Sequence, residues 1–202
     1  MADSPNSEGI TKRSEVELKI TGALRSLLDG GTPWGSVTVD AIAHEADIKR
    51  TLFYVYFPDR NAVLIRLGNQ LIETTVQGIE AHWLVAADGP DSLRKEMEAF
   101  WRTQEGFSPV LRALMEGATV DPELKEYWKT LSRAFVEPTK RRIEQLREAG
   151  HQGTDADPEM LALCLILMTE KVLLEGLQLG GSSNDELVNA AFELWRLVIY
   201  GS

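Results

Sequence analysis

Apolar residues recur at spacings of three and four positions along most of the chain, which is the period of one face of an α-helix. Over residues 14–29 this pattern predicts one amphipathic helix, and the pair Gly30 and Gly31 predicts its end. No stretch alternates polar and apolar residues over the length of a strand, so no sheet is expected. The pattern therefore predicts an all-α fold.

Two shorter helices are predicted after this first one. The hydroxyl of Thr38 can cap the first of them, and the chain breaks near Asp47. The second covers residues 49–56 and ends before a proline. Three helices with a tight turn between the last two can close a small core. The sequence predicts a three-helix, helix-turn-helix domain over residues 11–58, preceded by a disordered tail over residues 1–10.

The remainder of the chain, residues 59–202, predicts a larger helical domain. Acceptor side chains and prolines satisfy or remove the unpaired amides at helix starts, and glycines favour helix ends. Pro138 should bend or split the long segment over residues 121–149. The predicted starts are Asp59, Pro90 with Asp91, Ser108 with Pro109, Asp121 with Pro122, Asp157 with Pro158, and Asn184 with Asp185; the predicted ends are Gly89, Gly106, Gly117, Gly150 with Gly153, and Gly180 with Gly181.

Composition is that of a soluble, cytoplasmic protein. Hydrophobic residues make up 44% of the 202 residues, which is enough for substantial cores. No apolar run approaches the roughly 20 residues needed to cross a bilayer, and the polar first residues are unlike a signal peptide. The single cysteine, Cys164, excludes an internal disulfide and lies in an apolar run, where we expect a small core residue.

The charge of the chain limits how it can bind nucleic acid. A formal net charge of −10 argues against a protein that coats nucleic acid without specificity, because phosphates must be neutralised by Lys and Arg. Residues 1–60 hold 7 Lys or Arg and 9 Asp or Glu, a net charge of −2. Between positions 49 and 66 the balance is basic, since Asp59 is the one acidic residue there; the basic residues are Lys49, Arg50, Arg60 and Arg66.

Hydrogen-bond donors gather at the start of the predicted helix over residues 49–56. A helix that enters the major groove needs exposed donors in its first turn and an apolar underside that fixes its angle. Lys49, Arg50 and Thr51 supply donors that can face base edges or phosphates. The apolar underside is expected from Ile48, Phe53, Tyr56 and Phe57, which pack rather than contact bases.

The segment VTVDAIAHEADIKRTLFYVYFPDRNAVL, residues 37–64, resembles the DNA-binding signature of TetR-family regulators in order and spacing. The resemblance implies that Tyr54 meets a phosphate, and that Thr38 and Arg60 clamp the DNA backbone on either side of the recognition helix. Arg60 replaces the customary Lys. Asp47 stands where the family usually has Gly, and Lys49 replaces a small capping residue, which makes Asp47 a candidate cap.

Large apolar side chains are frequent in the predicted helices between positions 91 and 169, where they can form an ordinary core or line an adaptable cavity. Residues 165–176 and 193–201 look like the last two helices of EthR-like repressors, which bind elongated hydrophobic ligands. In this chain Ile166 and Thr169 replace polar amides, so a small apolar effector is expected. The candidate ligand-binding residues are Phe100, Trp101, Trp128, Phe135, Ile166, Thr169 and Trp195.

The last two predicted helices, over about residues 158–180 and 185–200, are apolar on more than one face. They can simply close the domain core. The resemblance implies that they pair with their twofold mates, so that a homodimer presents two recognition helices to operator double-stranded DNA. The implied mechanism is a repressor that is released when the effector favours a dimer unable to fit successive major grooves.

Two other functions stay open at this point. One is a helical dimerisation module without DNA binding, which the net charge of −2 over residues 1–60 permits. The other is a ferritin-like metalloenzyme, which needs paired Glu-x-x-His motifs inside helices, whereas the chain has only Glu148 and His151 across Gly150. The prediction is therefore a regulator that is not an enzyme and needs neither a metal nor a cofactor.

Overall fold

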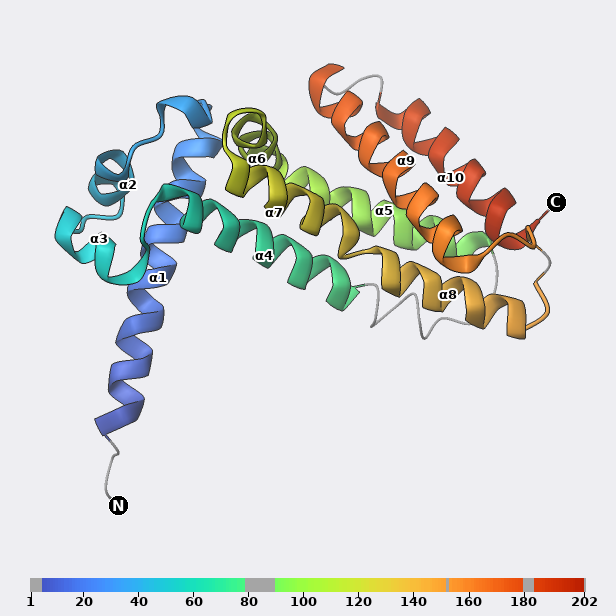
Figure 1. Ribbon diagram of the computed structural model, residues 1–202, viewed down its shortest axis with the longest axis horizontal. Helices are drawn as coiled ribbons and strands as arrows, with labels where there is room; N and C mark the ends of the chain where they lie inside the picture. Colours follow the sequence, from blue (N-terminus) through green and yellow to red (C-terminus); the bar gives the residue numbers. More distant parts are fainter. Residues whose placement is uncertain (1–4, 79–89, 152, 180–183, 202) are drawn as a thin grey trace. The chain divides into compact units, whose positions relative to one another are not determined.

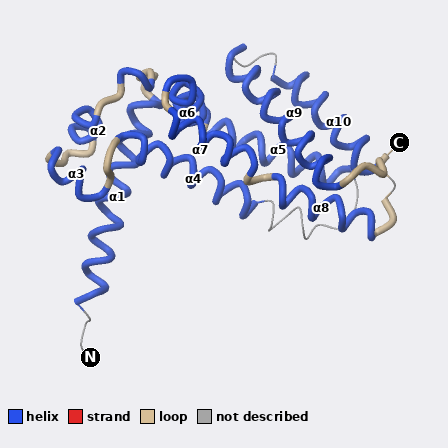
Figure 2. The backbone as a smooth tube through the Cα atoms, viewed as in Figure 1, coloured by secondary structure: helices blue, strands red, loops and turns tan. Residues whose placement is uncertain are grey.

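The computed structural model describes residues 5–78, 90–151, 153–179 and 184–201 (Figure 1). These residues form ten α-helices and one short 3-10 helix, with no strand among them, which confirms the all-α prediction (Figure 2). The 3-10 helix η1 covers Trp34–Ser36. The α-helices are α1 (Pro5–Asp29), α2 (Val39–Glu45), α3 (Arg50–Tyr56), α4 (Arg60–Gly78), α5 (Pro90–Gly106), α6 (Ser108–Val120), α7 (Pro122–Arg133), α8 (Val136–Glu148), α9 (Pro158–Leu179) and α10 (Asn184–Tyr200).

The chain divides into two compact units, each built from two stretches of sequence. Unit 1 is Met1–Gln70 with Pro109–Trp128, and unit 2 is Leu71–Ser108 with Lys129–Ser202. Helices α4 and α7 each continue from one unit into the other. The boundary between residues 58 and 59 that the sequence predicts separates a DNA-binding domain from a ligand-binding and dimerisation domain. This functional boundary stays a prediction.

Unit 1 contains the helix-turn-helix. Helix α1 packs against both α2 and α3, and α2 packs against α3. The core between them is completely apolar at its centre, where Ile20, Leu24, Ile42 and Phe53 are fully buried. Helices α6 and α7 add the buried residues Leu111, Leu114 and Leu124 to the same unit.

Unit 2 is a helical bundle. Helix α9 packs against α8 and α10, and α10 also packs against α5; α9 and α10 run antiparallel, side by side (Figure 1). Its buried side chains are mainly large and apolar, and they include Leu93, Trp101, Phe135, Ile143, Leu165, Phe192, Trp195 and Ile199.

Most of the predicted helix starts are capped as expected. Thr38 Oγ1 accepts from the Ala41 amide at 3.1 Å, Asp59 Oδ1 from Ala62 at 2.9 Å, and Asp157 Oδ1 from Met160 at 3.0 Å. Pro138 lies in the first turn of α8, and α7 ends five residues before it. Proline cannot donate to the carbonyl four residues earlier, here that of Ala134, so the segment splits near this point, as predicted.

Three predictions are wrong. Helix α1 begins at Pro5, so residues 5–10 are helical rather than a disordered tail; proline is favourable at a helix start because its missing N–H would be unpaired there. Gly117 lies inside α6 instead of ending it. Cys164 is exposed on α9 rather than part of the core, because the apolar run that contains it covers every side of the helix. The predicted ends at Gly89 and at Gly180 with Gly181 fall outside the described residues.

Gly117 lies inside α6 at a position where two large side chains leave no room for a Cβ atom. A Cβ there would lie 2.3 Å from Leu124 Cδ1 and 2.9 Å from Trp34 Nε1. Both neighbours are buried, so neither can move freely. We expect Gly117→Ala to destabilise the protein by about 1–3 kcal/mol through overpacking, seen as a Tm several degrees lower.

The matched control is Gly22→Ala in the exposed part of α1, where a Cβ meets nothing within 4 Å. Removing a helical glycine there should stabilise the protein by up to about 1 kcal/mol. Equal melting temperatures for the two variants would contradict the close contact at Gly117.

Within the described ranges, no helix has both the length and the apolar character needed to span a bilayer.

Candidate functional site

The turn that leads into α3 has the geometry of a helix-turn-helix. The Ile48 amide donates to the Ala43 carbonyl at 3.0 Å, which folds the chain back after α2. Asp47 adopts a left-handed conformation with φ of 51°, at the turn position where the family that residues 37–64 resemble usually has Gly. The N-cap residue of α3 is Lys49, whose side chain makes no capping bond, so Asp47 is not the cap that we considered.

Helix α3 is fixed from below by aromatic packing. Phe53 is fully buried, and its ring meets Tyr54 edge-on at 5.5 Å and Phe57 at 6.1 Å. The other side of α3 is open to solvent. Five of the six candidate DNA-binding residues are exposed on or beside it: Thr38, Lys49, Arg50, Thr51 and Tyr54.

Arg50 is held in place by two neighbours. Its Nη1 donates to Asp40 Oδ2 at 2.6 Å, and its Nη2 donates to the Tyr54 hydroxyl at 3.2 Å. The hydrogen bond with Tyr54 and the charge of Asp40 raise the pKa of Arg50 above its ordinary value. Both members of the ion pair are more than half exposed, and exposed pairs contribute little stability. A phosphate can therefore compete with Asp40 for this guanidinium.

Arg60 lies in a different environment from the other five residues. Its Nη1 donates to the carbonyl oxygens of Trp34, at 2.8 Å, and Val37. The guanidinium carbon lies 4.4 Å from the centre of the Trp34 ring, which is a cation–π contact. Arg60 thus ties the start of α4 to the segment before α2. The sequence offered no signal for these contacts, because they join positions more than twenty residues apart.

The segment that Arg60 holds is also tied to α6. The two carboxylate oxygens of Glu116 accept the amides of Trp34 and Gly35, each at 2.9 Å. Farther along, Asn61 Nδ2 donates to Asp121 Oδ2 at 2.8 Å, and this bond, followed by the bond from the Leu124 amide, lowers the pKa of Asp121. The helix-turn-helix therefore shares one framework with α4, α6 and α7 inside unit 1.

Unit 2 contains a cavity of about 110 Å³ that is partly open to solvent. Five of the seven candidate ligand-binding residues line it: Phe100, Phe135, Ile166, Thr169 and Trp195. The lining residues that the sequence did not single out are Thr74, Thr75, Leu93, Glu96, Met97, Ala99, Thr103 and Thr139. These eight residues come from three helices, α4, α5 and α8, and their convergence depends on the packing of the bundle.

The other two candidates lie elsewhere. Trp101 is buried beside Phe100, with ring centres 5.7 Å apart, but it is not among the lining residues. It follows Phe100 directly, and neighbouring residues on a helix point about 100° apart. Trp128 is half-buried at the end of the sequence assigned to unit 1, and it does not line the cavity of unit 2 either.

Most of the polar groups of the cavity are hydrogen-bonded within the protein. Thr169 Oγ1 accepts from Trp195 Nε1 at 2.9 Å and donates to the Leu165 carbonyl at 2.8 Å. Thr75 Oγ1 accepts from the side-chain Nε2 of the buried Gln104 at 3.4 Å. Glu96 is the one charged residue in the lining. A cavity of this kind favours a mainly apolar molecule.

Thr169 offers a test of this arrangement. In Thr169→Val, which has nearly the same shape, the buried N–H of Trp195 loses its acceptor, and we expect a loss of about 1–3 kcal/mol of stability. Thermal unfolding should show it as a lower Tm. Thr169→Ser keeps the hydroxyl and should restore most of the difference; a valine variant as stable as the parent would contradict the described hydrogen bond.

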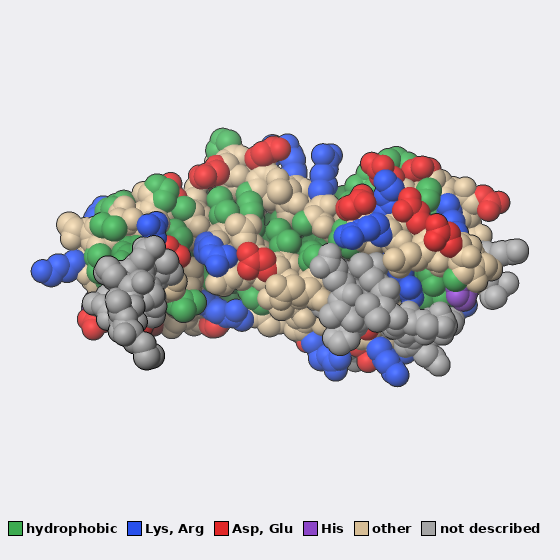
Figure 3. All heavy atoms as spheres, turned by 90° about the horizontal axis from the view of Figure 1, so that it is seen from below, with side chains coloured by type: hydrophobic (Ala, Val, Ile, Leu, Met, Phe, Trp, Pro, Cys, Tyr) green, Lys and Arg blue, Asp and Glu red, His purple; other side chains and the backbone are tan. Residues whose placement is uncertain are grey.

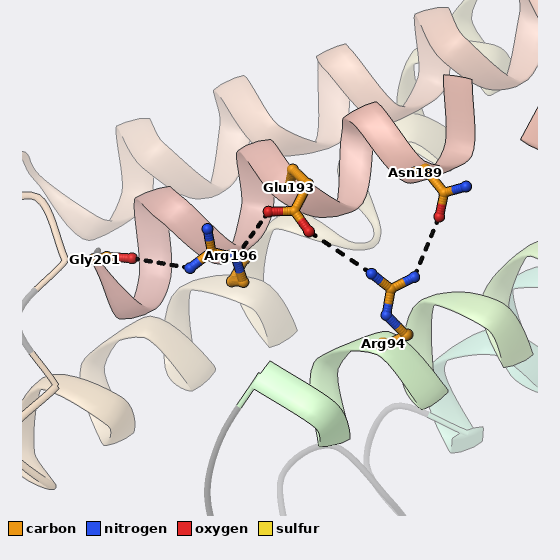
Figure 4. A network of polar contacts seen from close by, with 5 residues as sticks. All are labelled: Arg94, Asn189, Glu193, Arg196 and Gly201. Carbon is orange, nitrogen blue, oxygen red and sulfur yellow. Dashed lines mark hydrogen bonds and ion pairs between the residues drawn. The ribbon is translucent and has the colours of Figure 1, made fainter. Parts of the chain in front are cut away.

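The wall formed by α5 and α10 is fixed by a polar network (Figure 4). Arg94 Nη1 donates to Asn189 Oδ1 at 3.2 Å, and Arg94 Nη2 lies 3.7 Å from Glu193 Oε1. The guanidinium carbon also lies 3.9 Å from the centre of the Phe192 ring. Glu193 in turn accepts from Arg196 Nε at 2.9 Å. In the sequence, Arg94 follows Leu93 and Arg196 follows Trp195, and both Leu93 and Trp195 lie in the cavity wall.

An apolar face of α9 and α10 is open to solvent in the single chain. Met160, Leu167, Leu194 and Leu197 are each about half exposed, and Cys164 is exposed beside them in sequence. Residues 160, 164 and 167 follow the spacing of one side of a helix. We call these five residues the α9/α10 face. Exposed apolar surface of this extent on a bundle is typical of an interface.

Charged side chains are mixed on the surface. On the face drawn in Figure 3, Lys and Arg side chains are interspersed with Asp and Glu side chains. In the described part of the chain, no group of three His, Cys, Asp or Glu side chains is placed to hold a metal ion.

Comparison with known proteins identifies the family. The family model described as the C-terminal domain of the transcriptional regulator EthR matches residues 93–201. An HTH-type transcriptional regulator EthR from Mycolicibacterium smegmatis is 31% identical over 173 residues, covering 84% of this chain and 79% of that protein. A TetR transcription regulator from Haloarcula marismortui has the same fold, with a TM-score of 0.72 and 17% identity over 92% of this chain and 98% of that one. The chain belongs to the TetR family of transcriptional regulators.

Members of the TetR family bind operator DNA and small-molecule effectors, usually as dimers. One structure with the same fold is that of the TetR-family repressor FadR from Thermus thermophilus, in complex with lauroyl-CoA. Its TM-score is 0.66, with 19% identity over 92% of this chain and 94% of that chain. The resemblance inferred from residues 37–64 and from the last two helices is therefore confirmed, and the relatives are regulators rather than enzymes.

Proposed function

We propose that this TetR-family regulator is a repressor that binds its operator as a homodimer and releases it when a small apolar effector fills the cavity of unit 2. The observation that carries the proposal is that α9 and α10 contribute residues both to the cavity and to the exposed α9/α10 face. Ile166, Thr169 and Trp195 line the cavity, while Leu167 and Leu194, their neighbours in sequence, belong to the α9/α10 face. A ligand that moves these helices would thus change the dimer.

The DNA contacts that we propose are made by Lys49, Arg50, Thr51 and Tyr54 on α3, with Thr38 at the start of α2. All five are exposed. For Arg60 we propose a positioning role in place of the predicted phosphate contact, because its Nη1 is bound to two carbonyls and its guanidinium lies over Trp34.

The size and lining of the cavity support an effector that is small and apolar. A volume of about 110 Å³ is comparable with engineered cavities that bind benzene. Binding of lauroyl-CoA by the Thermus thermophilus relative supports ligands with an alkyl chain. A chain of that length would require the walls around Ile166 and Phe100 to move apart, and such movement is the kind of change that can be passed to the dimer.

The test is a mobility-shift titration against a panel of short alkyl and aromatic compounds and a panel of polar metabolites. We expect release of operator DNA with apolar compounds only. Ile166→Phe fills the cavity and should abolish release while leaving DNA binding intact. The control is Val120→Phe, at an exposed position of α6. The proposal is contradicted if Ile166→Phe responds to the same concentrations of the same compound as the parent protein.

A further inference from the structure

The outer side of α3 is apolar at its centre. Thr51 and Val55 lie one helical turn apart on the same side, and each is two positions from Phe53, which is fully buried on the opposite side. Val55 is 68% exposed. Leu52 is also exposed. Helix α3 therefore exposes the aliphatic side chains of Leu52 and Val55 and the methyl group of Thr51.

Side chains with an amide or an ammonium group are absent from the same helix. The sequence of α3 is RTLFYVY, with no Asn, Gln or Lys. Bidentate recognition of adenine uses Asn or Gln, and bidentate recognition of guanine uses Arg or Lys. The one guanidinium on α3 belongs to Arg50, at the edge of the outer side, and it is bonded to Asp40 and Tyr54.

One apolar group is exposed in the major groove of DNA, and it is the C5 methyl of thymine. Small aliphatic side chains pack against it, whereas they leave the polar edges of other bases unpaired. We infer that Val55, with the methyl group of Thr51, recognises thymine methyl groups and is the main determinant of which base pairs the operator contains. This inference rests on the proposed DNA binding through α3.

Neighbouring residues of α3 then have different tasks in DNA binding. Lys49, Arg50 and Tyr54 surround Thr51 and Val55 and bind phosphates, which fixes the helix in the groove but carries no sequence information. Val55 and Thr51 then supply the selectivity. A regulator with this division of tasks prefers sites with thymines at fixed positions in each half-site.

The experiment uses a duplex that the full-length protein selects from a random-sequence pool. Each thymine of one half-site is replaced in turn by deoxyuridine, which removes only the C5 methyl. We expect one or two positions at which the Kd of the parent protein rises about fourfold per methyl group. In Val55→Ala the Kd for the thymine duplex rises by a similar factor, and replacement at those positions has no further effect.

Val120→Ala is the matched control, since it is the same substitution at a valine that is 84% exposed on α6. The Val120→Ala variant should keep the difference in Kd between the thymine and deoxyuridine duplexes. Thermal unfolding should show that both variants are folded. The inference is overturned if no replacement changes the Kd of the parent protein, or if Val55→Ala remains as sensitive to deoxyuridine as the parent. If the protein selects no duplex at all, the proposed DNA binding itself is refuted, and the inference falls with it.

Discussion

Glutamate in place of Leu167 or Leu194 should convert the protein to a monomer and lower its affinity for a two-half-site operator by about 100-fold or more. Both leucines belong to the α9/α10 face, and an apolar interface would bury the new carboxylate without a partner. A monomer binds one half-site at a time and loses the gain from linking two sites, which is about 10²–10⁴-fold. Sedimentation velocity measures the mass, and fluorescence anisotropy measures the affinity.

Gln145→Glu is the control for this prediction, because it adds the same charge to an exposed position of α8 in the same unit. It should leave both the mass and the affinity unchanged. If Leu167→Glu and Leu194→Glu stay dimeric, the dimer uses another surface, and the exposed leucines need a different explanation.

Alanine in place of Lys49 or Arg50 should lower operator affinity by about tenfold or more for each residue, because a hydrogen bond to a charged group is lost. The slope of log K against log salt should fall by about one unit for each phosphate contact removed. The same titration should show no change of slope for Arg60→Ala, since we propose that Arg60 positions the segment before α2. The Arg60→Ala variant should instead have a lower Tm than the parent protein.

Lys125→Ala is the charge-matched control, since Lys125 is an exposed residue of α7 in unit 1. It should leave the slope unchanged. A slope that falls for Arg60→Ala would restore the phosphate contact that the sequence predicts for this residue, and an unchanged slope for Lys49→Ala would remove Lys49 from the DNA contacts.

The helix-turn-helix was predictable because its signals are local. Thr38 caps a helix that starts one residue later, Asp59 caps the start of α4, and Asp47 takes a left-handed turn that few residues tolerate. Each of these features depends on residues within three or four positions of one another. Such patterns are visible in the sequence without knowledge of the tertiary structure.

Features that depend on distant contacts were not predictable in the same way. Gly117 has the residue type of a helix end, but its role is to admit Trp34 and Leu124. Arg60 has the residue type of a phosphate ligand, but carbonyls more than twenty positions away accept its N–H groups. Cys164 lies in an apolar run, but α9 has apolar residues on both its buried and its exposed sides, so composition alone does not separate them.

The cavity lining contains both residues that the sequence predicted and residues that it did not. Phe100, Phe135, Ile166, Thr169 and Trp195 were candidates from residue type and resemblance, and they line one space. The other four threonines of the lining, Thr74, Thr75, Thr103 and Thr139, gave no signal, because a threonine in a helix does not by itself indicate a cavity. Trp101 was a candidate for its size alone, and although its ring contacts that of Phe100, it does not line the cavity.

The most direct test of the central claim is a footprint of the full-length protein on a duplex that it has itself selected, with and without a saturating apolar effector found in the titration. We predict two protected half-sites related by a twofold axis, with centres a whole number of helical turns apart, and loss of both on addition of the effector. Protection of a single unpaired site, or protection that persists at saturating effector, would contradict a dimeric repressor that is released by its ligand.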